Sequence, residues 1–496
     1  MKSFLGVVSI ALVCLACQKE TPGTDTAATD TTTTTPAATG VQYVPINPSV
    51  YVPQATIDGW INGTPINSAA ISEHMWSLWG GLTADSGETL NGTPLPVWET
   101  WYDSTEVYAS GTGSGSQPGA NASVVAATQP RVRKAGPKRQ FHLPHQFAKH
   151  GVLKTAGTSS DVTTLSFNRF NQEFRDHVWK NQYYNAQVLT TLNNSWPAGT
   201  PLQNRTIVTF PDPAMMLKPV FVLASGTQAG AVPYWNGSGT NATTNPENPT
   251  SDTWKQCVLG DPTGQATNSQ PLVCNQGNAG ETTMPAGSYQ VVPISANPAQ
   301  SAFYAIKLTQ DEVDEINSLA VIDKQTDAQG NPIAWQAGDF ALLVASHVSS
   351  REIDNWTWQT FWWSPSPSTL PSQPPNAMSA PPSIAKPWNQ YVACSAYYMV
   401  TPPTDPNGAP LYCFNPYLET GLTGLFNEPK TATTTGVHSN CMSCHRAAAW
   451  NASDYADAFL LDPADAKWFT GFTKTDFAWS IPVVAHDAPF VPPPGE

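Results

Sequence analysis

The sequence predicts an α+β protein. We expect a loop-rich, aromatic-rich body that contains a mixed or antiparallel sheet, followed by a mainly helical C-terminal region. Three observations support this prediction. Strand-like apolar runs gather in the second half of the chain, helical patterns occur both before and between them, and a Cys-x-x-Cys-His motif near the C-terminus precedes a further helical pattern. We therefore divide the chain into a body over residues 41–415 and a C-terminal region over residues 416–496.

The composition indicates a folded protein with few charges. Charged residues make up only 12% of the chain, whereas Trp (18) and Pro (46) are abundant. Disordered chains have few aromatic residues and high net charge, so this mixture favours a globular, loop-rich protein. The formal net charge is −14, from 37 acidic and 23 basic residues. This balance argues against a nucleic-acid partner and leaves a cationic redox partner possible.

The N-terminus predicts export. Lys2 is followed by a short apolar run, Phe4–Leu15, which is too short to span a bilayer. Residues 1–17 resemble a bacterial lipoprotein signal in which Cys17 becomes the lipidated first residue and anchors the protein to a membrane. Cys14 stands where such signals usually carry Leu, so ordinary secretory cleavage is the alternative. In both cases we expect an exported protein, periplasmic or anchored to the outer membrane of a bacterium.

Residues 18–40 predict a flexible tether between the anchor and the body. They are mainly Thr, Ala and Pro with hardly an apolar side chain. No later run approaches the 18 apolar residues that a membrane-spanning helix needs, so we expect no other membrane segment.

Six cysteines follow Cys17, and four of them predict two disulfides. Cys257 pairs locally with Cys274, and Cys394 with Cys413, each closing a loop of roughly twenty residues. In an oxidising compartment each such bond stabilises a fold by about 3 kcal/mol in the chain-entropy model. Four cysteines also allow two other pairings, and buried thiols are a further alternative.

The first half of the body carries three recognisable patterns. A helix is predicted around His74–Trp79, and the Trp and Tyr side chains of Trp98–Tyr102 are expected to pack in the core rather than form a ligand platform. The spacing of apolar residues predicts one long amphipathic helix over Ser166–Leu192. Met215–Leu223 then has the Val and Phe content of a strand.

The second half of the body is expected to supply most of the sheet. Residues 225–300 predict a large loop or insertion that encloses the first cysteine pair. Strands are predicted at Tyr289–Ile294, Ala302–Leu308 and Phe340–Val348, and the last is apolar on both faces, which predicts a central position. A short acidic helix is predicted over Gln310–Ala320, with Thr309 as its N-cap.

The motif Cys441-Met442-Ser443-Cys444-His445 predicts one covalently attached haem c. The two thiols, Cys441 and Cys444, would bind the haem vinyl groups as thioethers, and His445 would ligate the iron. A redox or zinc Cys-x-x-Cys is the alternative, and export favours haem attachment. Arg446–Trp450 predicts a helix that begins at the haem, so residues 416–496 are expected to form a mainly helical, cytochrome c-like region packed on the body.

A basic segment lies between residues 131 and 150. It contains Arg131, Arg133, Lys134, Lys138, Arg139, His142, His145, Lys149 and His150. We interpret it either as a solvated loop or as a docking site for an acidic partner or for the haem propionates.

The chain resembles a poorly characterised group of bacterial exported monohaem c-type cytochrome-domain proteins. The resemblance is carried by Trp98–Tyr102, by the strand with His347 and the aromatic segment Trp356–Phe361 after it, and by Asn440–His445. Together these segments touch most of residues 70–450. The resemblance implies electron transfer or haem-based oxidation.

The second axial ligand of the iron is not fixed by the sequence. No methionine follows Met442, and Met442 itself lies between the two attachment points, so the methionine ligand of small cytochromes is excluded downstream. The remaining candidates are His486, His347, Met378, Met399 or an open site. His438 is too close to His445 in sequence to reach the far side of the haem.

Three functions remain possible at this stage. The first is an electron-transfer cytochrome with a redox partner protein or a small-molecule electron donor or acceptor. The second is a haem oxidoreductase, similar to a peroxidase or oxygenase, with an open axial site. The third is a surface-binding lipoprotein whose haem is not catalytic. No catalytic residue set for a hydrolase or nucleotide enzyme is recognisable.

Overall fold

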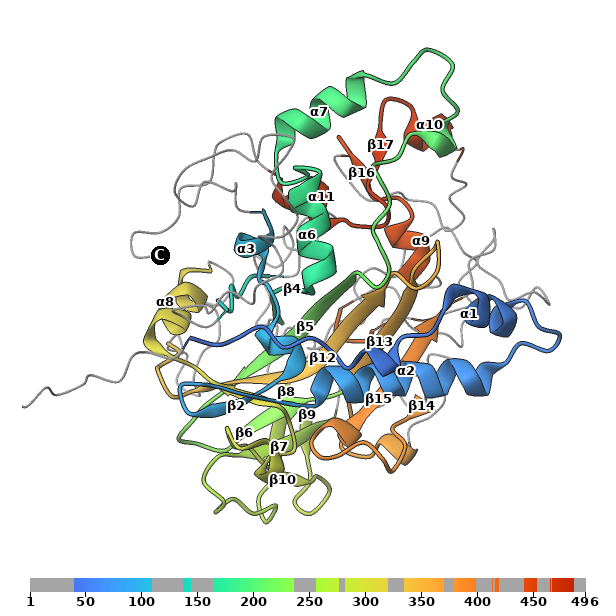
Figure 1. The fold of residues 1–496 in the computed structure, drawn as a ribbon. Helices are drawn as coiled ribbons and strands as arrows, with labels where there is room; N and C mark the ends of the chain where they lie inside the picture. The colour runs from blue at the N-terminus through green and yellow to red at the C-terminus, as the bar shows by residue number, and fades with distance from the viewer. Residues whose placement is uncertain are drawn as a thin grey trace, which may run out of the picture. The chain divides into compact units, whose positions relative to one another are not determined.

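An eight-stranded antiparallel sheet organises the body (Figure 1). The strands lie in the order β14-β15-β13-β12-β5-β3, with β11 paired to β12 and β4 paired to β5. Their bounds are Leu165–Ser166 (β3), Arg169–Phe170 (β4), Met215–Ala224 (β5), Ala305–Lys307 (β11), Phe340–Ser350 (β12), Thr357–Trp363 (β13), Met378–Ser379 (β14) and Tyr391–Ala396 (β15). The long strand β12 is central, as its two apolar faces predicted, and all seven pairings are antiparallel.

The structure is a computed structural model. It describes residues 40–108, 137–143, 164–235, 256–275, 282–319, 334–369, 378–397, 413, 415–418, 441–452, 464 and 466–485. The predicted signal, residues 1–17, and the tether up to residue 39 lie outside these ranges. The chain from Thr39 to Glu496 forms one compact unit.

Several helices of the body begin at a residue whose side chain caps them. Asn67 accepts a hydrogen bond from the amide of Ala70 at the start of α2, and Asn171 does the same for Phe174 in α6. Thr309 and Glu312 form the capping box of α8, which confirms the predicted N-cap. The helices of the body are Gln54–Ile61 (α1), Ser68–Thr83 (α2), Ser104–Tyr108 (α3), Gln172–Lys180 (α6), Ala186–Asn194 (α7) and Gln310–Ser318 (α8).

The long helix predicted over Ser166–Leu192 is wrong. The segment begins as two short strands, β3 and β4, and then forms two helices, α6 and α7. Between the helices Gln182 takes a left-handed conformation with φ of 58°, which ends the helical path, and Asn185 caps the next helix through its side chain. The apolar spacing was preserved across this turn, so periodicity alone did not reveal it.

Residues 225–300 contain small sheets rather than only a loop. One sheet has the order β10-β7-β6, and a hairpin joins β8 to β9. Their bounds are Gly230–Pro233 (β6), Cys257–Asp261 (β7), Leu272–Asn275 (β8), Thr282–Met284 (β9) and Val291–Pro293 (β10), and a further hairpin near the N-terminus joins Asp85–Leu90 (β1) to Thr93–Pro96 (β2). Both predicted disulfides are present, Cys257–Cys274 and Cys394–Cys413.

The large sheet has two faces with different coverings. Helix α2 packs on one of them, where the ring of Trp79 stacks on Phe361 of β13 at a centroid distance of 4.1 Å. We call this side the α2 face. Side chains alternate along a strand, so the neighbours of Phe361, Thr360 and Trp362, point to the opposite side, which we call the motif face. Residues 415–418 cover part of the motif face, where Asn415 donates a hydrogen bond to the Thr360 hydroxyl at 2.8 Å.

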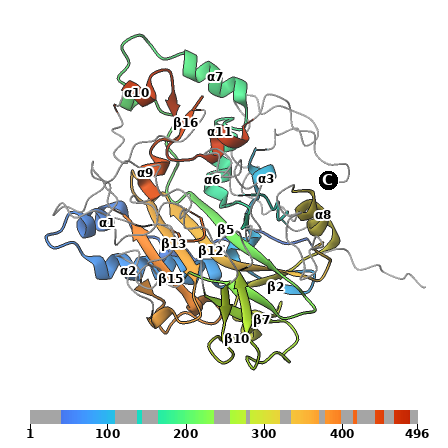
Figure 2. The ribbon, with the colours of Figure 1, turned by 180° about the vertical axis from the view of Figure 1, so that it is seen from behind.

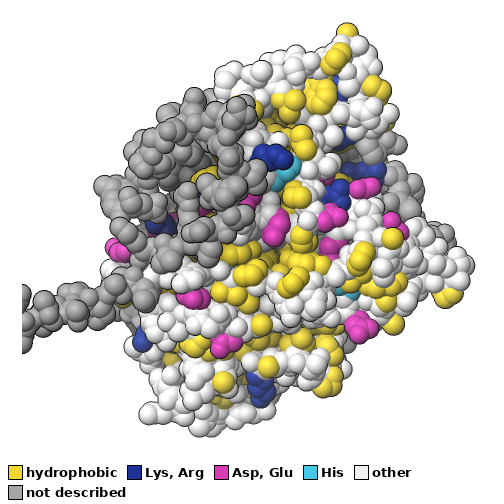
Figure 3. All heavy atoms as spheres, in the orientation of Figure 1, with side chains coloured by type: hydrophobic (Ala, Val, Ile, Leu, Met, Phe, Trp, Pro, Cys, Tyr) yellow, Lys and Arg dark blue, Asp and Glu magenta, His cyan; other side chains and the backbone are white. Residues whose placement is uncertain are grey.

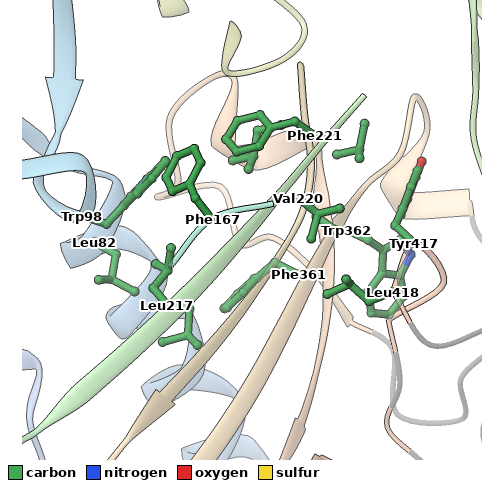
Figure 4. Packing of buried hydrophobic residues seen from close by; sticks show 14 of the residues in the cluster. Leu82, Trp98, Phe167, Leu217, Val220, Phe221, Phe361, Trp362, Tyr417 and Leu418 are labelled. Carbon is green, nitrogen blue, oxygen red and sulfur yellow. The ribbon is translucent and has the colours of Figure 1, made fainter. Parts of the chain in front are cut away.

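The core fills both sides of the sheet with aromatic residues, as the Trp-rich composition predicted. Figure 4 shows Tyr417 and Leu418 beside Trp362 on one side of the strands, and Leu82, Trp98 and Phe167 on the other. Trp79, Trp98 and Trp362 are each no more than 1% exposed. Charged side chains of both signs lie scattered among uncharged ones on the face drawn in Figure 3.

The α+β class is confirmed, but a mainly helical C-terminal region is not shown. In residues 441–485 the described elements are the short helices Cys441–His445 (α9), Ala466–Phe469 (α10) and Ser480–Val484 (α11), together with the antiparallel pair Ala449–Trp450 (β16) and Thr473–Lys474 (β17). The helix predicted over Arg446–Trp450 is therefore wrong, because α9 ends at His445 and the chain enters β16. In the part of the chain that the structure describes, no helix has the length and apolar character needed to cross a membrane.

Candidate haem-attachment site

The Cys-x-x-Cys-His motif forms the short helix α9. Figure 2 shows α9 at one end of β12 and β13. The side chains of Cys441 and Met442 are buried, whereas Cys444 and His445 are half-buried. Neither motif cysteine belongs to the two disulfides, which use the other four cysteines. The helix thus presents Cys444 and His445 toward the partly accessible side and keeps Met442 in the core.

His445 is held in one orientation by its surroundings. Its Nδ1 lies 2.8 Å from the carbonyl oxygen of Phe477. A carbonyl oxygen only accepts, so Nδ1 carries the proton and donates it, and the lone pair of the neutral ring is on Nε2. The ring also packs against Trp358 of β13 at a centroid distance of 4.2 Å. Metal-binding histidines usually have this pattern, with one nitrogen donating to a carbonyl and the other ligating.

The electrostatic environment keeps His445 neutral. The pKa of His445 is lowered to about 3, mainly by burial and to a smaller extent by interaction with His347 and Lys218, whereas the hydrogen bond to the Phe477 carbonyl opposes this shift. Above that pH the imidazole has the free lone pair that a metal ligand requires. The same interactions show that His347 and Lys218 are electrostatic neighbours of His445.

The loop that supplies the Phe477 carbonyl is strained and well anchored. Asp476 and Phe477 both have positive φ, 47° and 66°, a region that costs energy for residues with a Cβ. Asp476 accepts a hydrogen bond from the amide of Phe210 at 2.8 Å, and its carboxylate lies 3.9 Å from Arg351 Nε. These contacts to two other segments hold the strained loop in place, and with it the hydrogen bond to His445.

The indole of Trp479 fixes the other side of the helix. Its Nε1 donates a hydrogen bond to the carbonyl oxygen of Cys444 at 3.1 Å. Because Trp479 follows the Asp476–Phe477 loop directly, one short segment binds both the backbone of α9 and the ring of His445.

The motif face of the sheet contributes a second set of side chains. Two neighbouring rows of paired residues run across β5, β12 and β13. One row consists of Lys218, His347 and Thr360, and the next consists of Met216, Ser349 and Trp358. Directly paired residues point to the same side, so all these side chains lie on the face that Trp358 shares with His445. We define the half-buried patch as Met216, Lys218 and His347 from the sheet, with Cys444, His445 and Phe477 from the C-terminal segment.

The structure places two of the predicted axial ligands, His347 and Met378, on opposite faces of the sheet. His347 lies on the motif face and interacts with His445. Met378 pairs with Ala393, which pairs with Phe361, so the register places Met378 on the α2 face. Met399, His438 and His486 lie outside the described residues.

Sequence reasoning missed several residues of the site. Met216 and Lys218 lie in a strand that was predicted, but their position beside His347 depends on the pairing register of β5 and β12. Trp358 belonged to a segment that was noticed only for its aromatic content. Phe477 acts through its backbone carbonyl, which leaves no signal in the side-chain pattern.

One described member of the basic segment is buried rather than exposed. Of its members, Lys138, Arg139 and His142 are described, and the other six lie outside the described residues. Arg139 is only 5% exposed and pairs with Glu99 through Nε and with Glu312 through Nη1 at 3.2 Å. Arg139 is therefore a core residue and not part of a solvated loop or docking surface.

Among the residues that the structure describes, no three His, Cys, Asp or Glu side chains form a group that could hold a metal ion. A covalent haem would need two thiols outside disulfides, a neutral imidazole with its lone pair on Nε2, and a partly accessible surface beside them. Cys441, Cys444 and His445 meet these requirements.

Comparison with models of protein families, with curated proteins and with solved structures finds no match to this chain. The functional argument therefore depends on the chemistry of the site itself.

Proposed function

We propose that this protein is an exported c-type cytochrome that binds one covalent haem and transfers electrons. The observation that carries the proposal is the hydrogen bond from His445 Nδ1 to the Phe477 carbonyl at 2.8 Å, made within a Cys-x-x-Cys-His motif. This bond leaves Nε2 for iron in the residue that the motif assigns to that role. The haem, when bound, supplies a reversible one-electron couple at its iron.

Each residue of the site has a distinct task in this proposal. Cys441 and Cys444 hold the haem through thioethers, and His445 ligates the iron through Nε2. The Phe477 carbonyl orients the imidazole and increases its basicity, which favours the oxidised iron. Trp358 packs against the imidazole and excludes water from that side of the site.

The wider context of the proposal follows from the sequence. The chain would be lipidated at Cys17 and tethered through residues 18–40 in the periplasm or at the outer membrane, with residues 416–496 as a cytochrome c-like region. Its partner would be a redox protein or a small-molecule electron donor or acceptor. The net charge of −14 disfavours nucleic acid.

Covalent attachment gives a direct test. The purified wild-type protein should keep its haem through acidified-acetone extraction and under denaturing electrophoresis, and its pyridine haemochrome spectrum should show both vinyl groups saturated. Cys441→Ser or Cys444→Ser should shift that spectrum to one remaining vinyl group, and the double variant should lose haem on extraction.

The matched control is the double variant Cys257→Ser/Cys274→Ser. It also removes two cysteines, but they belong to a disulfide in the small sheets, so haem attachment should be unchanged. A wild-type protein that is expressed in a host competent for cytochrome c maturation and still carries no covalent haem would refute the proposal.

One observation favours a haem oxidoreductase as the second candidate. The half-buried patch leaves the surface beside His445 partly accessible, as a substrate or peroxide would require. An open iron site predicts a high-spin ferric spectrum and rapid cyanide binding, whereas electron transfer with two axial ligands predicts a low-spin spectrum that cyanide and carbon monoxide do not change.

A further inference from the structure

We infer that His347 is the second protein ligand of the haem iron, which makes the site a bis-histidine centre. The inference rests on the proposed function, because it requires a haem at Cys441, Cys444 and His445. The inference adds to the proposed function the ligand that decides between electron transfer and an open catalytic iron.

The first argument is the register of the sheet. His347 pairs with Lys218 on one side and with Thr360 on the other. Trp358 is two residues from Thr360 on the same strand, so Trp358 and His347 project from the same face in adjacent rows. The Trp358 ring contacts the His445 ring at 4.2 Å, which brings the haem motif to the rows that contain His347.

The second argument is the pattern of burial. Every residue of β12 is buried except His347, which is half-buried in the middle of an otherwise closed central strand. On β5, Met215 and Leu217 on the α2 face are buried, whereas Met216 and Lys218 on the motif face are half-buried. Here the sheet is therefore closed on the α2 side and partly accessible on the side that faces the motif, and the partly accessible residues are Met216, Lys218 and His347.

The third argument is the origin of the two imidazoles. His445 belongs to α9 and His347 to β12, so two elements far apart in sequence each bring a histidine to the motif face. A bis-histidine centre requires one imidazole from each side of the cofactor, and two separate elements can supply them.

Two other side chains on the motif face compete with His347. Lys218 is an ammonium at neutral pH and has no lone pair until it loses a proton. Met216 offers a thioether from the next row, the row that contains Trp358. An imidazole is neutral near pH 7 and is the commonest metal ligand in proteins, so His347 is the best suited of the three.

The inference is tested on the exported holoprotein by optical and electron paramagnetic resonance spectroscopy. We expect a low-spin ferric wild type that binds cyanide and carbon monoxide slowly or not at all. His347→Ala should become high-spin and bind both ligands rapidly, and added imidazole should restore the low-spin spectrum. His347→Met should show the sulfur-to-iron charge-transfer band and a raised reduction potential.

The competing ligands provide the controls. Met216→Leu and Lys218→Gln should both keep the wild-type spectrum, and far-ultraviolet circular dichroism should show that all variants are folded. A low-spin spectrum that survives His347→Ala but is lost in Met216→Leu, Lys218→Gln or His486→Ala would overturn the assignment. A high-spin wild type would also overturn it.

The failure of this inference is distinguishable from failure of the proposed function. If pyridine haemochrome analysis finds covalent haem but His347→Ala leaves the iron unchanged, only the assignment of His347 is wrong. If no covalent haem is found, the proposed function itself is wrong, whatever His347 does.

Discussion

Replacing Arg139 by Met is expected to lower the free energy of unfolding by about 3 to 5 kcal/mol, because it breaks a buried ion pair and leaves a charge without a partner. Arg139 donates through Nε to Glu99, and Tyr304 donates its hydroxyl to the other oxygen of the same carboxylate. Glu99 is 1% exposed and Tyr304 is fully buried. Removing the guanidinium would leave the buried Glu99 carboxylate without its ion-pair hydrogen bond, with the Tyr304 hydroxyl and the more distant charge of Arg169 still stabilising it.

The pKa of Arg139 shows how strongly these groups interact. Burial alone would lower it, but the carboxylates of Glu99 and Glu312 outweigh that effect and hold the pKa above its usual value. The guanidinium of Arg139 therefore stays charged in the core at every accessible pH, and it remains a positive partner for Glu99 and Glu312.

A double-mutant cycle supplies the control. Urea titrations of Arg139→Met, Glu99→Gln and the double variant should show that the double variant is less destabilised than the sum of the single ones, because neither charge is then left alone. A loss below about 1 kcal/mol for Arg139→Met, the range of a surface ion pair, would contradict this account.

Replacing Trp358 by Ala is expected to have two effects at once. Trp358 is only 4% exposed, and truncating a buried tryptophan costs about 3 to 5 kcal/mol of unfolding free energy. It would also remove the ring that packs on His445 and let water reach that side of the site. Greater hydration stabilises the more highly charged oxidised iron, so the reduction potential should fall.

Trp79→Ala is the matched variant on the other side of the same strand. Trp79 stacks on Phe361 at 4.1 Å on the α2 face, so its loss should cost a similar amount of stability. Trp79 does not contact His445. The haem of the Trp79→Ala variant should therefore have the reduction potential and absorption spectrum of the wild type. Thermal unfolding of both variants measures the loss of core packing, and a potentiometric titration of both measures the change in the reduction potential of the haem. Equal shifts of potential in both variants would contradict a specific role for Trp358.

The elements that the sequence predicted correctly are those whose signal is local. The continuous apolar run of β12 indicated a central strand, and the Thr309-x-x-Glu312 pattern indicated the start of α8. Two cysteine pairs with short separations indicated both disulfides. In each case the deciding residues lie within about twenty positions of one another, so a short stretch of sequence is enough to predict the element or the disulfide.

The rest depended on contacts between distant segments. Arg139 looked like a member of a basic, solvated segment, but Glu99, forty residues earlier, and Glu312 draw it into the core. The motif could be located from the sequence alone and its haem stays a prediction, but its docking against Trp358 and the carbonyl of Phe477 is a tertiary arrangement. The turn over residues 181–185 was missed because the apolar residues on either side of it kept a spacing close to that of one helix.

The disulfide Cys394–Cys413 shortens the covalent path between β15 and α9. Cys394 belongs to β15, and the chain runs 47 residues from there to Cys441 (441 minus 394) but only 28 from Cys413 (441 minus 413). Because the cost of closing a loop rises with the logarithm of its length, this bond lowers the entropic cost of docking α9 onto the sheet by about 0.5 kcal/mol. In an oxidising compartment the docking of α9 onto the sheet is favoured by this amount, and reduction of the disulfide would remove the contribution.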